Sequence, residues 1–210
     1  MTDERWISVG AEGEAAIAPD LAEVMLGVSA SDRKLDKAQI DVNARTSAVL
    51  SRLRELGVGE PDLAARGVSV QPMYDPKDGR RIAGYHVGRR VTARVRDLER
   101  LGDVLDGVVA AGANEVHGVE MSALDTSAPE HEALRRAVAA AHAKAEAIAA
   151  AAGIGLGKLV RLEEEGGVPV QPFPRARMAM AMEAAGTPTE VVAGELTITR
   201  RIRAWFDVAE

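Results

Sequence analysis

The chain contains no cysteine among its 210 residues, and aromatic residues make up only 3% of it. Without cysteine, disulfide bonds, thiolate metal sites and cysteine nucleophiles are all excluded. Because aromatic side chains are so few, the core has to be built from alanine, valine, leucine and isoleucine, which favours close packing of helices on sheets. No segment approaches the ~20 consecutive apolar residues that a bilayer-spanning helix needs. The sequence therefore predicts no transmembrane segment.

The chain also lacks an excess of positive charge: 32 acidic residues outnumber 26 basic ones, and the formal net charge is −6 at pH 7. A phosphate backbone requires a cationic surface, so nucleic acid is not an expected partner. The opening MTDERWISVG contains no basic segment followed by an apolar one, as a signal peptide would. As written, the chain is predicted to be cytoplasmic; the alternative is a periplasmic or exported protein whose signal has been removed. The overall composition, 47% hydrophobic and 28% charged, is that of an ordinary globular protein.

What the sequence does contain is a repeated alternation of polar and apolar residues. Residues 7–17 show it first, and residues 85–95 and 196–208 repeat it at greater length. A period of two indicates antiparallel sheets with one dry face and one wet face. Strands are predicted at 7–17, 21–30, 63–74, 82–96, 115–124, 158–164 and 196–208. Gly118 interrupts the alternation of its strand, which suggests a β-bulge.

Apolar residues at spacings of three and four predict helices over residues 35–56, 98–111 and 128–152. Asp32 or Ser31 is a plausible N-cap for the first of them. The third helix is expected to turn six residues inward: Leu134, Val138, Ala141, Ala145, Ile148 and Ala152. Because this seam is mostly alanine, whatever packs against it must approach closely.

The order of these elements predicts an α+β fold with two lobes. Residues 20–125 follow the β-α-β-β-α-β order of a ferredoxin-like lobe. Residues 1–19 and 126–210 would form a second α/β lobe from the first strand, the long C-terminal helix and the last two strands. The two chain ends would then be neighbouring strands, which would weld the lobes together. Residues 166–190, rich in Met, Pro, Gly and Ala, keep no period and are expected to form a flexible loop.

Several ordered motifs along the chain resemble the SIMPL-domain family, also called DUF541. The opening ISVGAEGEAAIAPDLAEVMLGVSA, with its Pro19-Asp20 turn and Gly27-Val28, is similar to the entry hairpin of that family. The middle of the chain and the alanine-rich AVAAAHAKAEAIAAAAGIGLGKLVRLEEE match as well, as do a methionine-rich loop and a closing strand from Gly194 to Phe206. Positions in the middle that fall where the family pattern expects them are Pro72, Tyr74, Gly84-Tyr85, the Val-Arg-Asp-Leu run at 95–98 and the Ala-Gly-Ala-Asn run at 111–114.

The resemblance covers nearly the whole chain and implies a non-enzymatic, envelope- or stress-related bacterial protein that assembles into homo-oligomers. The family offers no established catalytic residues to transfer. One departure is that family members usually carry an export signal, whereas this chain shows none. The compartment therefore stays open between the two alternatives given above.

Three methionines at alternate positions, Met178, Met180 and Met182, are weak candidates for a metal site. Thioether sulfur at that spacing is able to hold Cu(I). The simpler interpretation is that methionine fills irregular gaps and mobile interfaces, since no histidine or cysteine stands beside these residues.

Arginines on the polar faces of two predicted strands form the second candidate, an anion-binding or interaction face. If the two strands were adjacent, their guanidinium groups would be able to meet a carboxylate or a phosphate. The simpler interpretation is a solvated face whose arginines pair across strands with Glu12, Glu14 and Glu23. The arginines concerned are Arg90, Arg94, Arg96, Arg201 and Arg203.

No catalytic motif accompanies these features. No G-x-S-x-G sequence is present, the four histidines are scattered, and the glycines of residues 153–157 follow a helix, not a strand. The sequence therefore predicts a non-enzyme without a cofactor that acts through self-assembly or a protein partner, with a homo-oligomer as the expected state. The alternative is a protein that binds a small ligand or a metal in a cleft between the lobes or at the Met-rich loop.

Overall fold

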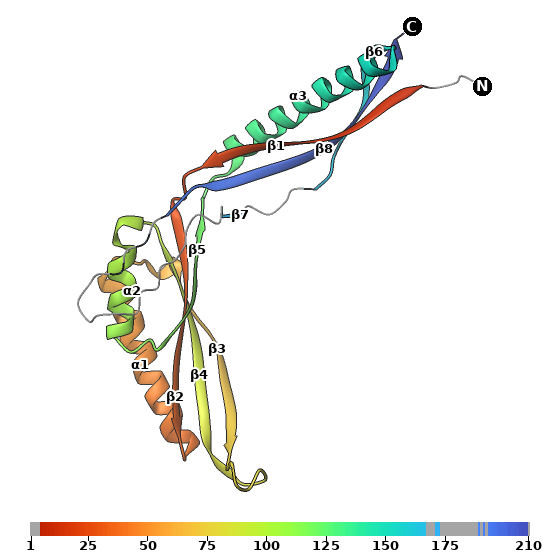
Figure 1. The fold of residues 1–210 in the computed structure, drawn as a ribbon. Coiled ribbons are helices and arrows are strands. Elements are labelled where there is room, and N and C mark those ends of the chain that lie inside the picture. Colours follow the sequence, from red (N-terminus) through yellow and green to blue (C-terminus); the bar gives the residue numbers. More distant parts are fainter. Residues whose placement is uncertain (1–4, 167–170, 173–188, 190, 192, 210) are drawn as a thin grey trace. The chain divides into compact units, whose positions relative to one another are not determined.

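The computed structural model describes residues 5–166, 171–172, 189, 191 and 193–209 (Figure 1). Helices and antiparallel sheets are mixed in it, so the predicted α+β class is confirmed. The chain divides into two compact units. Of the described residues, the terminal unit holds 5–19, 123–166, 171–172 and 194–209. The central unit holds residues 20–122 together with Thr189, Val191 and Ala193.

The terminal unit is built around a sheet made from both ends of the chain. Strand β1 (Trp6–Ile17) pairs antiparallel with β8 (Leu196–Ala209) over its full length (Figure 1). The predicted neighbourhood of the two ends is therefore confirmed. Strand β6 (Gly155–Glu164) and the two-residue strand β7 (Gln171–Pro172) also pair with β8. The loop expected over residues 166–190 lies almost entirely outside the described residues, which include only 166, 171–172 and 189 of it, so it stays a prediction.

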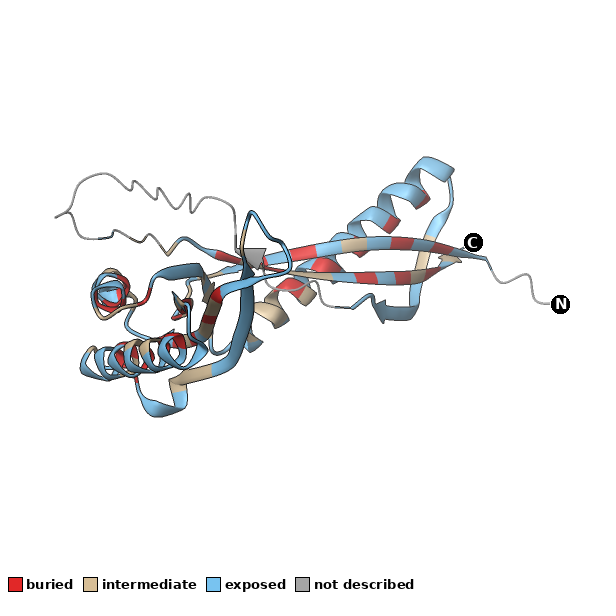
Figure 2. Ribbon diagram, turned by 90° about the horizontal axis from the view of Figure 1, so that it is seen from below, coloured by how far each residue is buried: buried red, intermediate tan, exposed pale blue. Residues whose placement is uncertain are grey.

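Helix α3 (Ser127–Ala152) covers one face of β1 and β8. Buried and exposed residues alternate along both strands, as the sequence predicts (Figure 2). Large aliphatic and aromatic side chains on the strands, such as Ile7, Ile202 and Phe206, pack against small side chains on the helix. The buried residues of α3 are Ala133, Ala137, Ala141, Ala145 and Ala149.

The predicted inward seam of α3 is only half right. Leu134, Ala141 and Ala145 are buried or packed at the margin of the core. Val138, Ile148 and Ala152 are exposed. The observed seam advances by four residues at every step, and since a turn takes 3.6 residues, such a seam drifts around the helix axis. A seam assumed to run straight therefore selects residues on the flanks of the helix.

Gly13 of β1 explains why the helix comes so close to the sheet. A Cβ atom at this position would lie 2.2 Å from the carbonyl oxygen of Ala133 and 2.4 Å from the backbone nitrogen of Ala137. Neither backbone atom is able to move without moving the helix. The alanine seam and this glycine therefore form one tight contact between α3 and β1.

The free edge of β1 is covered by two cationic side chains of α3. Lys144 Nζ donates to the carbonyl oxygen of Gly10 at 2.9 Å, and Arg136 Nη1 donates to that of Glu14 at 2.7 Å. Charged side chains on an edge discourage pairing with a further strand. β1 is therefore a protected edge.

The central unit has one antiparallel sheet of four strands in the order β3-β4-β2-β5. Helix α1 (Leu35–Glu55) packs on β2 and β4 and against α2 (Leu101–Ala110). Its core contains only aliphatic side chains, among them the fully buried Leu26, Leu53 and Leu101. The bounds of the strands are Leu21–Asp32 for β2, Leu63–Tyr74 for β3, Ile82–Val95 for β4 and Glu115–Ser122 for β5.

Three local features of the central unit test the sequence predictions. The bulge in β5 is confirmed, because Met25 pairs with Gly118 and Leu26 with Val116, which leaves His117 as the extra residue. The start of the helix predicted over 98–111 is a 3₁₀ turn, η2 (Leu98–Arg100), and α2 follows it. A second 3₁₀ turn, η1 (Glu60–Asp62), precedes β3.

The predicted N-cap of α1 is wrong. The N-cap position is occupied by Lys34, and no side chain caps the helix there. The Asp32 carboxylate accepts the N–H of Lys34 at 2.8 Å instead. The carboxylate therefore closes a turn just before the helix and does not reach its first-turn N–H groups.

Two residues from the late part of the chain pack in the central unit. Thr189 Oγ1 donates to Asp106 Oδ1 at 2.6 Å, and Val191 lies against the aliphatic core. The predicted division places both residues in the second lobe. The exact domain boundaries remain a prediction.

Candidate functional site

The five candidate arginines lie in two different sheets. Arg90 and Arg94 are on β4, and Arg96 directly follows it, whereas Arg201 and Arg203 are on β8. β4 belongs to the central sheet and β8 to the terminal sheet. The two groups are therefore not neighbours in one sheet.

Four of these arginines bind carboxylates, as the simpler interpretation has it. Arg94 donates to Glu23 across the strands at 3.1 Å, and Arg201 donates to Glu12 at 3.0 Å. Arg203 lies 2.7 Å from Glu165. Arg96 makes two bonds to Asp62, at 2.8 and 3.0 Å. Exposed Arg90 has no ion pair among the described residues. Because a carboxylate neutralises each of these four arginines, they offer little net positive charge to a further anion.

The Arg96–Asp62 pair gives a prediction for pH dependence. Hydrogen bonds from the Arg96 guanidinium hold the pKa of Asp62 below its ordinary value. A carboxyl whose pKa falls on folding stabilises the protein above the unfolded pKa, about 4, and loses that contribution as the pH falls through the folded pKa. We expect Asp62→Asn to lose less stability than the parent when the pH is lowered through this window, measured by urea unfolding at a series of pH values.

Asp103→Asn is the matched control, since Asp103 is an exposed carboxylate on α2 without an ion pair in the described structure. It should keep the parent's acid dependence. If Asp62→Asn also kept it, the pair would contribute nothing to acid sensitivity.

The methionine candidates and the histidines offer no metal site that can be described. Met178, Met180 and Met182 lie outside the described residues. In the part of the chain that the structure describes, no three His, Asp or Glu side chains gather so that they could hold a metal ion. His142 is 3.4 Å from Glu146 and meets the Phe206 ring edge-on.

A hydrogen-bonded polar cluster lies where β2 meets β5. Ser29 Oγ donates to Glu115 Oε1 at 2.6 Å, and Glu115 Oε2 lies 3.4 Å from His117 Nε2. The carboxylate therefore separates the hydroxyl from the imidazole. A serine nucleophile needs the base at its own hydroxyl and the carboxylate behind that base. This order of groups does not support acyl transfer.

The same cluster shows which way the backbone of β2 faces. Ser29 N–H donates to Asn114 Oδ1 at 2.9 Å, and its carbonyl oxygen accepts Asn114 Nδ2 at 3.0 Å. The backbone of Ser29 thus faces the β5 side. Because this direction alternates along an antiparallel strand, the backbone of Ala30 faces β4, and that of its partner Val87 faces β2.

The alternation carries through β4 to the outer strand β3. Gly88 must face β3, so its partner Ser69 bonds to β4. The N–H and C=O groups of Val68 and Val70, and the C=O of Pro72, therefore point to the free edge. Every residue from Arg66 to Tyr74 is exposed. Among the described residues, the edge of β3 is therefore open, unlike that of β1.

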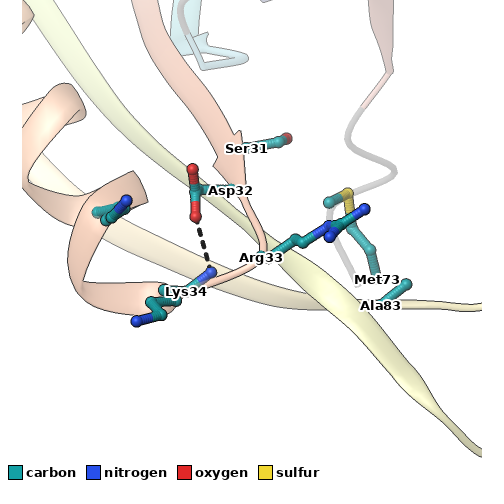
Figure 3. Close-up of a pocket in the computed structure, with 7 residues that line it drawn as sticks. Ser31, Asp32, Arg33, Lys34, Met73 and Ala83 are labelled. Atoms are coloured by element: carbon teal, nitrogen blue, oxygen red, sulfur yellow. Dashed lines mark hydrogen bonds between the residues drawn. The ribbon is translucent and has the colours of Figure 1, made fainter.

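A cavity of about 540 Å³ lies where the β3–β4 hairpin meets the start of α1. Figure 3 shows the Arg33 side chain extending towards Met73, and the Asp32 carboxylate bonded to the N–H of Lys34. The volume is within the range of small-ligand sites, roughly 300–1,000 Å³. Its lining residues are Ser31, Asp32, Arg33, Lys34, Lys37, Met73 and Ala83.

Neither the open edge nor the cavity was among the sequence candidates. The sequence does not show which strand lies at the edge of a sheet. Only the strand order in the structure identifies β3 as an edge strand. The cavity had a usable signal, since the run Asp-Arg-Lys-Leu-Asp-Lys at 32–37 places three cations within five positions of an acidic chain. The same run is also typical of the solvated start of a helix. Only the hairpin packed beside it distinguishes a binding site from such a helix start.

A comparison with known protein families finds a match along nearly the whole chain. Residues 7–206 match the SIMPL family, described as a protein of unknown function (DUF541). The chain belongs to this family. The description names no catalytic activity. Within the described part of the chain, no helix combines the length and the apolar character that crossing a membrane requires.

Individual relatives agree with the assignment. The chain is 33% identical to the 26 kDa periplasmic immunogenic protein of Brucella melitensis over 216 residues, which covers 99% of this chain and 86% of the relative. It is 28% identical to the uncharacterised protein YggE of Escherichia coli over 121 residues, 57% of this chain and 49% of the relative. A crystal structure of an unknown protein from Galdieria sulphuraria aligns at 13% identity over 89% of this chain and 82% of that chain, with a TM-score of 0.24, too low to support a shared fold.

Proposed function

We propose that this protein works by assembling with further copies of itself and not by converting a substrate. The observation that carries the proposal is the open edge of β3. Its backbone offers unpaired donors and acceptors at Val68 and Val70, and pairing with an incoming strand satisfies such groups. The contrast with β1, whose edge is covered by Lys144 and Arg136, supports the choice of β3.

A second copy of β3 fits this edge in the antiparallel direction. If a two-fold axis passes beside Ser69, Val68 of one copy faces Val70 of the other, and Val70 faces Val68. Each pair then exchanges N–H···O=C bonds in both directions, so the contact is self-complementary, as a two-fold interface requires. Pairing cannot extend far, because Pro72 lacks an N–H and Gly67, at φ +65°, forms a bulge.

Apolar side chains supply the driving force for this contact. Val68 and Val70 are 55% and 46% exposed, and both point to the face of the sheet that carries the aliphatic core. α1 packs on β2 and β4, so it leaves this part of the face open. Burying such valines contributes roughly 25 cal/mol for each Å² removed from water. A short contact of this size predicts association that depends on protein concentration.

Two further observations concern the cellular compartment of the protein and the proposed absence of catalysis. The word periplasmic in the name of the Brucella relative favours the exported alternative over the cytoplasmic one for this chain. An envelope- or stress-related role without catalysis is consistent with the polar cluster at Ser29, whose order of groups does not activate the hydroxyl. The candidate copper site at Met178, Met180 and Met182 lies outside the described residues, so no described contact supports it.

The test replaces Val70 by proline. This change removes an edge N–H and leaves the bonds of Ser69 and Gln71 to β4 in place, because an outward-facing proline is tolerated on an edge strand. We expect the parent to form a dimer or larger species at high micromolar concentration. Val70→Pro should shift towards monomer by at least ~tenfold in the dissociation constant, which corresponds to ~1.4 kcal/mol. Size-exclusion chromatography with light scattering gives the masses, and circular dichroism verifies the fold.

Val70→Ile is the matched control, since it keeps the N–H, the β-branched shape and the apolar surface at this position. It should associate nearly as the parent does. A parent that stays monomeric at every concentration would contradict the proposal. Equal association of the parent and Val70→Pro would show that the interface does not lie at the edge of β3.

A further inference from the structure

The cavity at the start of α1 combines cationic groups from a short run of sequence with an apolar wall from the hairpin. Arg33 and Lys34 precede the helix, and Lys37 lies in its first turn. Met73 of β3 and Ala83 of β4 line the other side. Figure 3 shows the Arg33 side chain alongside Met73, so a cationic and an apolar surface adjoin in this cavity.

The three cations differ from most arginines of the described structure in having no carboxylate partner. Arg94, Arg96, Arg201 and Arg203 are all ion-paired. Neither a side-chain hydrogen bond nor an ion pair is found for Arg33, Lys34 or Lys37 among the described residues. The one acidic group in the lining, Asp32, already accepts the N–H of Lys34. The lining therefore carries a net charge of about +2 on a chain whose total is −6.

The backbone adds donors of the same polarity. No side chain caps α1, so the free N–H groups of its first turn stay available at the end where the helix dipole is positive. Guanidinium, ammonium and amide N–H groups together are the set that proteins use for phosphate. Met73, 38% exposed, offers contact area to an apolar part of the same ligand.

We propose that this cavity binds a small molecule that carries a phosphate group. The phosphate meets Arg33, Lys34 and Lys37, and the less polar part of the ligand lies against Met73 and Ala83. The inference concerns the central unit alone and does not rest on self-assembly through β3. The volume of about 540 Å³ accommodates a ligand of the size of a mononucleotide.

The test is isothermal titration calorimetry of the full chain with inorganic phosphate, adenosine monophosphate and citrate as probes. We expect saturable binding of one adenosine monophosphate per chain, weaker binding of phosphate alone, and weaker binding of citrate. The double variant Arg33→Gln/Lys37→Gln should weaken the binding of adenosine monophosphate by about tenfold or more, because each lost charged contact is worth that order.

The matched control is Arg100→Gln/Lys158→Gln, which removes one arginine and one lysine charge from exposed positions without ion pairs in the described structure. It should bind as the parent does. In amide NMR spectra, adenosine monophosphate should shift Asp36 and Lys37 in the parent but not in the cavity variant. Absence of saturable binding, equal loss in both double variants, or citrate binding as tightly as adenosine monophosphate would each overturn the proposal.

Discussion

Replacing Gly13 by alanine is expected to lower the free energy of unfolding by about 3 kcal/mol or more. The added methyl group would sit 2.2 Å from the carbonyl oxygen of Ala133 and 2.4 Å from the nitrogen of Ala137. Both atoms belong to the backbone of α3, so the helix has to move away from the sheet. Movement opens the contact along the whole alanine seam, because the helix responds as a rigid body.

Urea unfolding followed by tryptophan fluorescence is a suitable measurement, since both tryptophans of the chain, Trp6 and Trp205, lie on β1 and β8 of the terminal unit. Gly10→Ala is the matched control on the same strand, because its Cβ would meet nothing closer than 3.9 Å. It should change stability by less than ~1 kcal/mol. Equal effects of the two substitutions would mean that α3 does not contact β1 as closely as described.

Replacing Leu26 by alanine is expected to cost about 3 kcal/mol, within the ~2–5 kcal/mol range for deep leucine sites. Leu26 is 0% exposed at the centre of the aliphatic core of the central unit. The buried residues around it are alanine, valine and leucine, whose short side chains cannot extend far into the space, so most of the cavity remains. Urea unfolding followed by far-ultraviolet circular dichroism measures the loss.

Ile40→Ala is the control for this substitution, because Ile40 on α1 is 67% exposed. Surface changes of this kind usually stay within ~0.5 kcal/mol. If Leu26→Ala cost no more than Ile40→Ala, the core around β2 would have to be far looser than its burial indicates.

Element types were predictable because alternation and helical periodicity are local signals. The strands at 7–17 and 196–208 each show one buried face. Their pairing was predicted because the order of elements left both chain ends to the same lobe. The seam of α3 was misplaced because hydrophobicity ranks Ile148 above Ala149, whereas the close contact with the sheet buries the small side chain and leaves the large one exposed.

Sites depended on long-range geometry, which local patterns do not contain. Arg94 and Arg201 look alike in sequence, and only strand order shows that they lie in different sheets, each beside its own glutamate. The open edge of β3 and the cavity next to Arg33 are likewise properties of neighbours brought together by the fold. Arg33 became informative only because it lines this cavity and has no carboxylate partner among the described residues.

The pairing of β1 with β8 also has a consequence for folding during synthesis. Trp6 pairs in register with Asp207, so about 200 further residues must be synthesised before β1 can pair with β8. At roughly 5–20 residues per second, that delay is about 10–40 s. During it, the nascent β1 exposes the apolar row of Ile7, Val9 and Ala15 without the strand that completes its sheet.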